Sequence, residues 1–265
     1  MSVTNGAEAS ILAESIALAS AGRFAEASAG ALGIGQVGFA GGDFEGDIDN
    51  LGTVDVIAVA LAESGEAAQA DAVAVGIAQD LFGPAGSVNG DISNTSDSSI
   101  DVTALAEAFA PIAHAEASAT GVEQFVGGAD VDGGVDNDGT ISVAASAEAN
   151  GSLETDAEAR AAGVLQFGTA EGSAELDGDN TGLIDVTAEA DAFGEETFAA
   201  AEAVGWVQDA TSETGTAELL LTNSGEVDVS AIANSESNSE NATAFASATG
   251  AVSYTHLTLP TIYSV

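Results

Sequence analysis

Small apolar residues alternate with polar ones through most of the chain. In residues 54–62 every second position is Val or Ala, and Asp55 stands on the other side of the alternation. Residues 184–190 repeat this pattern, with Asp185 in the equivalent place. A period of two is typical of β-strands, because successive side chains point to opposite faces. The pattern predicts strands that bury small apolar side chains and turn acids and hydroxyls toward solvent.

Two phrases return along the chain at nearly constant spacing. The first is Gly-x-x-Gln preceded by alternating Ala, and its glycine steps by 43, 45, 42, 42 and 45 residues through Gly33, Gly76, Gly121, Gly163, Gly205 and Gly250. The second is Asn-x-Gly followed by alternating Ile or Val and Ala, at Asn50, Asn137, Asn180 and Asn223, with looser copies at Asn5 and Asn94. Such self-similarity predicts units that bury their apolar faces by stacking on one another.

The repeats predict an all-β coil. Ala and Glu would also suit a helix over residues 103–119, but Pro111 interrupts that stretch, and Val, Ile, Thr and Gly fill the same places in other copies. From Gly139 to Gly163 is 24 residues and from Gly163 to Gly182 is 19, so each repeat divides into similar halves. We therefore expect a parallel β-helix of about six 43-residue repeats with two turns each, rising roughly 10 Å per repeat.

The glycine phrases carry two further expectations. In Asn-x-Gly the glycine can take a positive φ, and Asn tolerates the left-handed region, so the phrase predicts a turn. In Gly-x-x-Gln an apolar residue follows the glycine where strict alternation places a polar one, which predicts a bulge that shifts the alternation by one. The shifted glutamines then point inward as a hydrogen-bonded ladder, unless they lie at a surface turn. They are Gln36, Gln79, Gln124, Gln166 and Gln208.

The net charge of the chain limits the classes of molecule that it can bind. The sequence has 43 acidic residues against two basic ones, a net charge of -41, so we expect no nucleic-acid partner.

No apolar run is long enough to span a bilayer, and we expect no membrane insertion. The absence of Cys excludes a disulfide framework. The first residues lack the basic and apolar segments of a signal peptide, so the sequence is expected to be an internal piece of a longer chain.

The sequence contains few of the residue patterns that are typical of enzyme active sites. His114 lies between two alanines at an outward position, and we expect it to be solvated. Phosphate loops, zinc spacings and nucleophile elbows are missing from the sequence, and carboxylates are too common for spacing alone to nominate a glycosidase pair. We predict that the protein is not an enzyme. Trp206 stands where other copies have Ile or Val, and it is expected in the core.

The acidic segments before the Asn turns suggest that the protein binds calcium. Their Asp residues recur at alternate positions beside Gly, and alternate strand residues share a face about 7 Å apart. Carboxylate oxygens are ligands that Ca²⁺ prefers. The alternative is that Asp, Gly and Asn are ordinary turn formers. The candidate ligands are Asp43, Asp47, Asp49, Asp130, Asp132, Asp136, Asp138, Asp177 and Asp179.

The repeat fails at Ser253, where the earlier copies have Gln. Residues 252–265 contain no acid, and the string VSYTHLTLPT resembles the translation of a transposon-end adapter used in sequencing libraries. We therefore expect residues 1–251 to be the β-solenoid domain, a fragment of a longer protein, and residues 252–265 to be a non-native tail.

The two repeated phrases resemble those of large exoproteins of Gram-negative bacteria, similar to autotransporter passengers and filamentous-haemagglutinin-type adhesins. The resemblance covers residues 5–251. It implies a right-handed parallel β-helix at the cell surface or in the extracellular space. It also implies a structural or adhesive role, with host or biofilm surface glycans or proteins as partners. The alternative is a fragment of a carbohydrate-active β-helix, a polysaccharide lyase or a tailspike-like glycosidase, which the even spacing disfavours.

Overall fold

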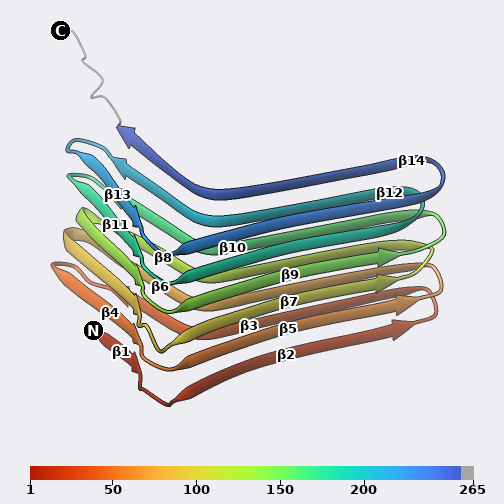
Figure 1. Ribbon diagram of the computed structural model, residues 1–265, viewed down its shortest axis with the longest axis horizontal. Coiled ribbons are helices and arrows are strands. Elements are labelled where there is room, and N and C mark those ends of the chain that lie inside the picture. The colour runs from red at the N-terminus through yellow and green to blue at the C-terminus, as the bar shows by residue number, and fades with distance from the viewer. Residues whose placement is uncertain (258–265) are drawn as a thin grey trace, which may run out of the picture.

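The computed structural model describes residues 1–257, which wind into a parallel β-helix of six coils (Figure 1). Each coil has a short, a middle and a long strand segment. The short segments are β1 (Ser2–Asn5), β4 (Phe44–Asn50), the ends of β6 (Ala67–Asn94) and β8 (Ile112–Asn137), β11 (Ala174–Asn180) and β13 (Ala217–Asn223). The middle segments are β2 (Ser10–Ala21), β5 (Thr53–Ser64), β7 (Ser99–Phe109), β9 (Thr140–Asn150) and the starts of β12 (Leu183–Ser212) and β14 (Glu226–Leu257). The long segments are β3 (Phe24–Phe39), the starts of β6 and β8, β10 (Glu154–Ala170) and the ends of β12 and β14.

One repeat makes one turn of the coil. Thr53 of β5 pairs with Ser10 of β2 on one side and with Ser99 of β7 on the other, a full repeat away in each direction. The predicted parallel β-helix is confirmed, but the expectation of two turns per repeat was wrong. The two halves of a repeat face each other across the core instead of stacking, so each repeat rises roughly 4.8 Å. Outward residues such as Asp55 and Asp101 are therefore direct neighbours on adjacent strands.

Alanine forms most of the core. The predicted inward positions of the middle segments are buried in the inner coils, for example Val54 and Ala58 in β5, and partly buried in the first and last coils. The long segments present a matching row of buried alanines, such as Ala70 and Ala115. A second, smaller core lies between the short segments and the ends of the long segments, and it contains Leu81 and other larger side chains. Trp206 is 1% exposed, as expected for a core residue.

The long strands bend, and the short segments fold back against their ends (Figure 1). The alternation shifts at the glycine of Gly-x-x-Gln: Gly76 and Ile77 are both buried, and Gln79 consequently points inward. The predicted shift of alternation is confirmed. A Cβ atom at Gly76 would lie 2.5 Å from the carbonyl oxygen of Gly121 and 2.5 Å from Cγ2 of Ile100, so the glycine permits close packing of coils and facing strands.

The glycine of Asn-x-Gly serves close approach rather than a positive φ. No glycine in the described chain has a positive φ, so the predicted reason for this residue was wrong. A Cβ atom at Gly52 would lie 2.3 Å from the carbonyl oxygen of Ala9, because each turn is stacked directly on the turn of the previous coil.

Two amide ladders run along the stack. The predicted glutamine ladder is confirmed, with Nε2-to-Oε1 distances of 2.8–2.9 Å from Gln79 to Gln36, Gln124 to Gln79, Gln166 to Gln124 and Gln208 to Gln166. The asparagines, which the sequence suggested only as turn residues, form a second ladder. Nδ2-to-Oδ1 distances of 2.7–2.8 Å join Asn5, Asn50, Asn94, Asn137, Asn180 and Asn223 in that order.

The start of the expected tail continues the last coil. Residues 252–257 pair with residues 207–212, and Ser253 donates from Oγ to Oε1 of Gln208 at 3.3 Å. The rest of that tail, residues 258–265, lies outside the described residues. Within residues 1–257 no helix has the length and apolar character needed to cross a bilayer.

Candidate functional site

The outward face of the short segments carries three columns of acidic residues. Strand pairing places Asp47 beside Asp91, and Asp136 beside Asp179. The columns run through Glu45, Asn89, Asp132, Glu175 and Glu218; through Asp47, Asp91, Gly134, Asp177 and Leu220; and through Asp49, Ser93, Asp136, Asp179 and Thr222. Because neighbouring rungs are roughly 4.8 Å apart, within the Debye length of about 8 Å, salt screens their repulsion only in part. We call this surface the acidic face.

Asp91 lies among several other carboxylates of the acidic face. A Cβ atom at Gly134 would lie 2.6 Å from Oδ1 of Asp91, so the carboxylate leans over the bare glycine of the next strand. Partial burial raises the pKa of Asp91 to about 6, and repulsion from Asp132, Asp47 and other neighbouring acids adds to the shift. The acidic face thus favours any bound positive charge, whether a proton or a cation.

Other carboxylates of the acidic face also have raised pKa values. The pKa of Asp136 is raised by partial burial and then by Asp179, and that of Asp177 by partial burial and then by Asp132. The pKa of Glu175 is raised first by the charge of Asp177.

Six of the nine predicted calcium ligands lie on the acidic face. They are Asp47, Asp49, Asp132, Asp136, Asp177 and Asp179. The other three brace turns between coils: Asp43 accepts from the backbone N–H of Ser87 at 3.1 Å, Asp130 from that of Ser173 at 2.9 Å, and Asp138 from Oγ1 of Thr181 at 2.5 Å. Within residues 1–257, none of the nine belongs to a group of three or more converging His, Cys or carboxylate ligand atoms.

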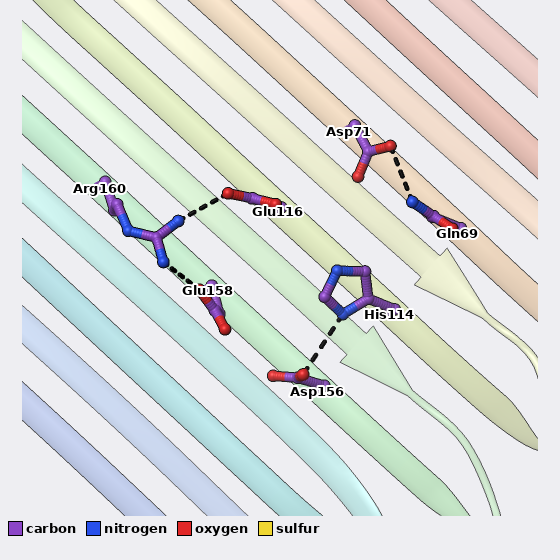
Figure 2. A network of polar contacts seen from close by, with 7 residues as sticks. All are labelled: Gln69, Asp71, His114, Glu116, Asp156, Glu158 and Arg160. Carbon is purple, nitrogen blue, oxygen red and sulfur yellow. Dashed lines mark hydrogen bonds and ion pairs between the residues drawn. The ribbon is translucent and has the colours of Figure 1, made fainter.

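A separate polar cluster lies on the outward face of the long segments (Figure 2). Asp71 of β6 pairs in register with Glu116 of β8, and His114 stands two residues before Glu116 on the same face. One ligand atom from each of these three half-buried residues lies within 4.8 Å of the others. We call them the Asp–His–Glu triad.

Neighbouring side chains hold each member of the triad (Figure 2). Gln69 donates from Nε2 to Oδ2 of Asp71 at 3.0 Å. Nδ1 of His114 lies 3.4 Å from Oδ2 of Asp156, on β10 of the next coil. Arg160 donates from Nη1 to Oε1 of Glu116 at 2.6 Å, and its Nη2 contacts Glu158.

The surroundings of His114 favour positive charge. The contact with Asp156 raises the pKa of the imidazole, partial burial opposes the shift, and the charges of Asp156, Asp71 and Glu116 add to it. The expectation of a merely solvated histidine therefore missed its acidic neighbours. Both Asp71 and Glu116 precede a repeat glycine by five residues, a signal that was visible in the sequence once each repeat is taken as one turn.

The outward surface of the long segments also has a hollow over the last three coils. Glu154 of β10 pairs in register with Glu196 of β12, and both line this hollow together with Asp156 and Asn241.

Comparisons of the chain with protein-family models, with curated proteins and with solved structures gave no match.

Proposed function

We propose that the chain is a segment of a non-enzymatic structural or adhesive repeat protein whose acidic surface collects cations, Ca²⁺ above all. The observation that carries this proposal is the stacking of carboxylates on the acidic face, where Asp47 pairs directly with Asp91. Two unit charges about 4 Å apart repel by about 1 kcal/mol in water and by more where the protein lowers the effective dielectric constant. A divalent cation between them replaces that repulsion with attraction.

The uniformity of the coil supports a structural role. Parallel pairing continues from coil to coil in all three kinds of segment, and the two amide ladders tie the same positions together. A stacked body of this kind gives a stiff shaft with continuous outward sheets. Such sheets suit cation-bridged contacts with surface glycans or proteins, and we place the protein outside the cell, at the bacterial surface.

Calcium-dependent melting tests the cation part of the proposal. We expect the melting temperature of the full chain to rise when Ca²⁺ replaces EDTA at constant ionic strength, by about 2–4 °C for each kcal/mol gained. Replacing Asp47, Asp91 and Asp177 by Asn should remove most of the increase. The matched triple variant, with Glu14→Gln, Asp80→Asn and Glu189→Gln, should retain it, because none of these acids pairs with another acid on an adjacent strand. Identical melting curves in Ca²⁺ and in EDTA would exclude cation binding that stabilises the fold.

Adhesion is tested separately. Beads coated with the chain should bind surfaces that carry acidic glycans more strongly in Ca²⁺ than in EDTA. Equal retention of coated and uncoated beads would reject the adhesive role while leaving the melting result intact.

A carbohydrate-active β-helix remains the second candidate because of the hollow beside Glu154 and Glu196. An enzyme of this class would release new reducing ends or unsaturated products from a polysaccharide, and the Glu154→Gln variant would lose that activity. Unchanged polysaccharides after long incubation with the chain would reject this candidate for those substrates.

A further inference from the structure

We propose that Asp71, His114 and Glu116 bind one divalent transition-metal ion of the Zn²⁺ class. The three side chains come from two adjacent coils and share one outward face, with Asp71 directly opposite Glu116. Their ligand atoms lie within 4.8 Å of one another. Tetrahedral zinc holds nitrogen and oxygen ligands about 3.4 Å apart, and small rotations of half-buried side chains cover the remaining distance.

Each of the three has one polar atom held by a neighbour and a second one without a partner among the described residues. Oδ2 of Asp71 accepts from Gln69, and Oε1 of Glu116 accepts from Arg160. Oδ1 of Asp71 and Oε2 of Glu116 have no hydrogen-bond partner in the described chain. The held atoms fix the orientation of the carboxylates, and the free ones supply ligand oxygens.

His114 has the same arrangement. Its Nδ1 faces Oδ2 of Asp156 at 3.4 Å, and its other ring nitrogen points toward Glu116 and Asp71 (Figure 2). An N–H at Nδ1 directed at a carboxylate leaves the lone pair on Nε2 free to bind a metal, as in carboxylate–histidine–zinc sites. Asp156 thus acts as a positioning residue for the imidazole ligand.

The donor set selects the class of metal. Ca²⁺ and Mg²⁺ prefer oxygen ligands, whereas an imidazole nitrogen suits Zn²⁺ and related transition metals. Two carboxylates and a neutral imidazole also balance the charge of a divalent ion. The triad therefore differs from the acidic face, which offers only oxygen, and the two surfaces can be tested independently.

The proposed metal joins coils. Asp71 belongs to the second coil, His114 and Glu116 to the third, and their partners Asp156 and Arg160 to the fourth. A metal bound here links two adjacent strands of one sheet directly, and the contacts of Asp156 and Arg160 with its ligands connect it to a third strand. Because the ion binds the stacked coil and not the separated strands, its binding also stabilises the fold.

Titration calorimetry of the full chain, freed of metal with EDTA and dialysed, tests the proposal. We expect Zn²⁺ to bind with a stoichiometry of one at this site in the presence of excess Ca²⁺ and Mg²⁺. The His114→Ala and Asp71→Asn variants should lose that binding. The control is His256→Ala, which removes the other histidine of the chain; its Nε2 lies 3.6 Å from Asp209. Circular dichroism of each variant checks that the coil is intact.

The Asp156→Asn variant separates a built site from chance attraction. It keeps all three ligands but weakens the acceptor for Nδ1, and loss of such an outer partner lowers metal affinity about 10–100-fold. Co²⁺ added to the chain should give visible absorption of a tetrahedral site, and His114→Ala should abolish it. Unchanged Zn²⁺ affinity in His114→Ala, or displacement of Zn²⁺ by equimolar Ca²⁺, would overturn the proposal; neither result would affect the calcium-dependent melting.

Discussion

The side-chain amide of Gln124 donates a hydrogen bond to Oε1 of Gln79 at 2.9 Å, across two adjacent coils. The same Nε2 reaches the backbone oxygen of Gly90 at 2.7 Å, and Oε1 of Gln124 accepts from Gln166 at 2.9 Å. Gln124 is completely buried. A buried amide is stable only when its donors and acceptors are paired, so each rung depends on the rungs above and below.

Replacing Gln124 with Leu should therefore destabilise the coil although the side-chain volume changes little. The change leaves the buried Oε1 of Gln79 without its donor from Gln124, and an unpaired buried polar group costs about 1–3 kcal/mol. Urea unfolding in EDTA measures the loss. The control is Gln69→Leu, an outward glutamine of the same sheet, which should cost less; equal losses in the two variants would contradict a special role for the ladder.

The asparagine ladder predicts a dependence on position. Asn137 donates to Asn180 and accepts from Asn94, both at 2.7 Å, and it is completely buried. Within residues 1–257 the side chain of Asn223 only accepts a hydrogen bond, from Asn180 at 2.8 Å, and it is exposed. Asn137→Ala should lower the free energy of unfolding by about 1–3 kcal/mol and Asn223→Ala by less than 1 kcal/mol. Thermal melting of both variants at the same pH gives the comparison, and a larger loss for Asn223→Ala would contradict it.

The glycine of Gly-x-x-Gln offers a matched pair of substitutions. A Cβ atom at Gly121 would lie 2.5 Å from Cγ2 of Ile141 and 2.6 Å from the carbonyl oxygen of Gly163. At the equivalent Gly250, no atom of the described residues lies within 4 Å of the Cβ position. Gly121→Ala should thus cost about 1–3 kcal/mol through overpacking, and Gly250→Ala should be nearly neutral. Urea unfolding tests both, and equal effects would mean that the glycine is not required by packing.

The sequence predicted the strands, their faces and the inward glutamines, because these follow from local alternation. The exchange of faces at Gly76 was visible in the apolar Ile77 that follows it, without knowledge of any distant contact. The asparagine ladder was harder to predict, since Asn50 followed by Gly52 is equally typical of an exposed turn.

The number of turns per repeat could not be predicted from the local alternation of residues. Two similar half-repeats give the same alternation whether they stack on each other or face each other across a core. Only the pairing partner separates the cases, and Thr53 pairs a full repeat away. This error placed Asp71 roughly 10 Å from Glu116 instead of on the adjacent strand, which hid the triad around His114.

The acidic face predicts how stability depends on pH. Asp91 has a pKa near 6 in the folded chain, above the ordinary value of 3.8 expected after unfolding. Between these values the folded state binds more protons, so the contribution of Asp91 to stability is fully present below about pH 4 and is lost as the pH rises through 6. Above pH 6 the ionised carboxylate destabilises the fold.

Asp91→Asn should therefore stabilise the protein at pH 7 and have little effect at pH 3.5. Because solvent still screens one side of this partly exposed carboxylate, the gain at pH 7 is expected on the order of 1 kcal/mol or less. The difference in unfolding free energy between wild type and variant, measured in EDTA from pH 3.5 to 7.5, gives the profile. Asp80→Asn controls for the change in net charge, because Asp80 pairs with Val37 and Phe125 and not with another acid. A difference that stays constant with pH would contradict a raised pKa of Asp91 caused by its burial and by the charges of Asp132 and Asp47.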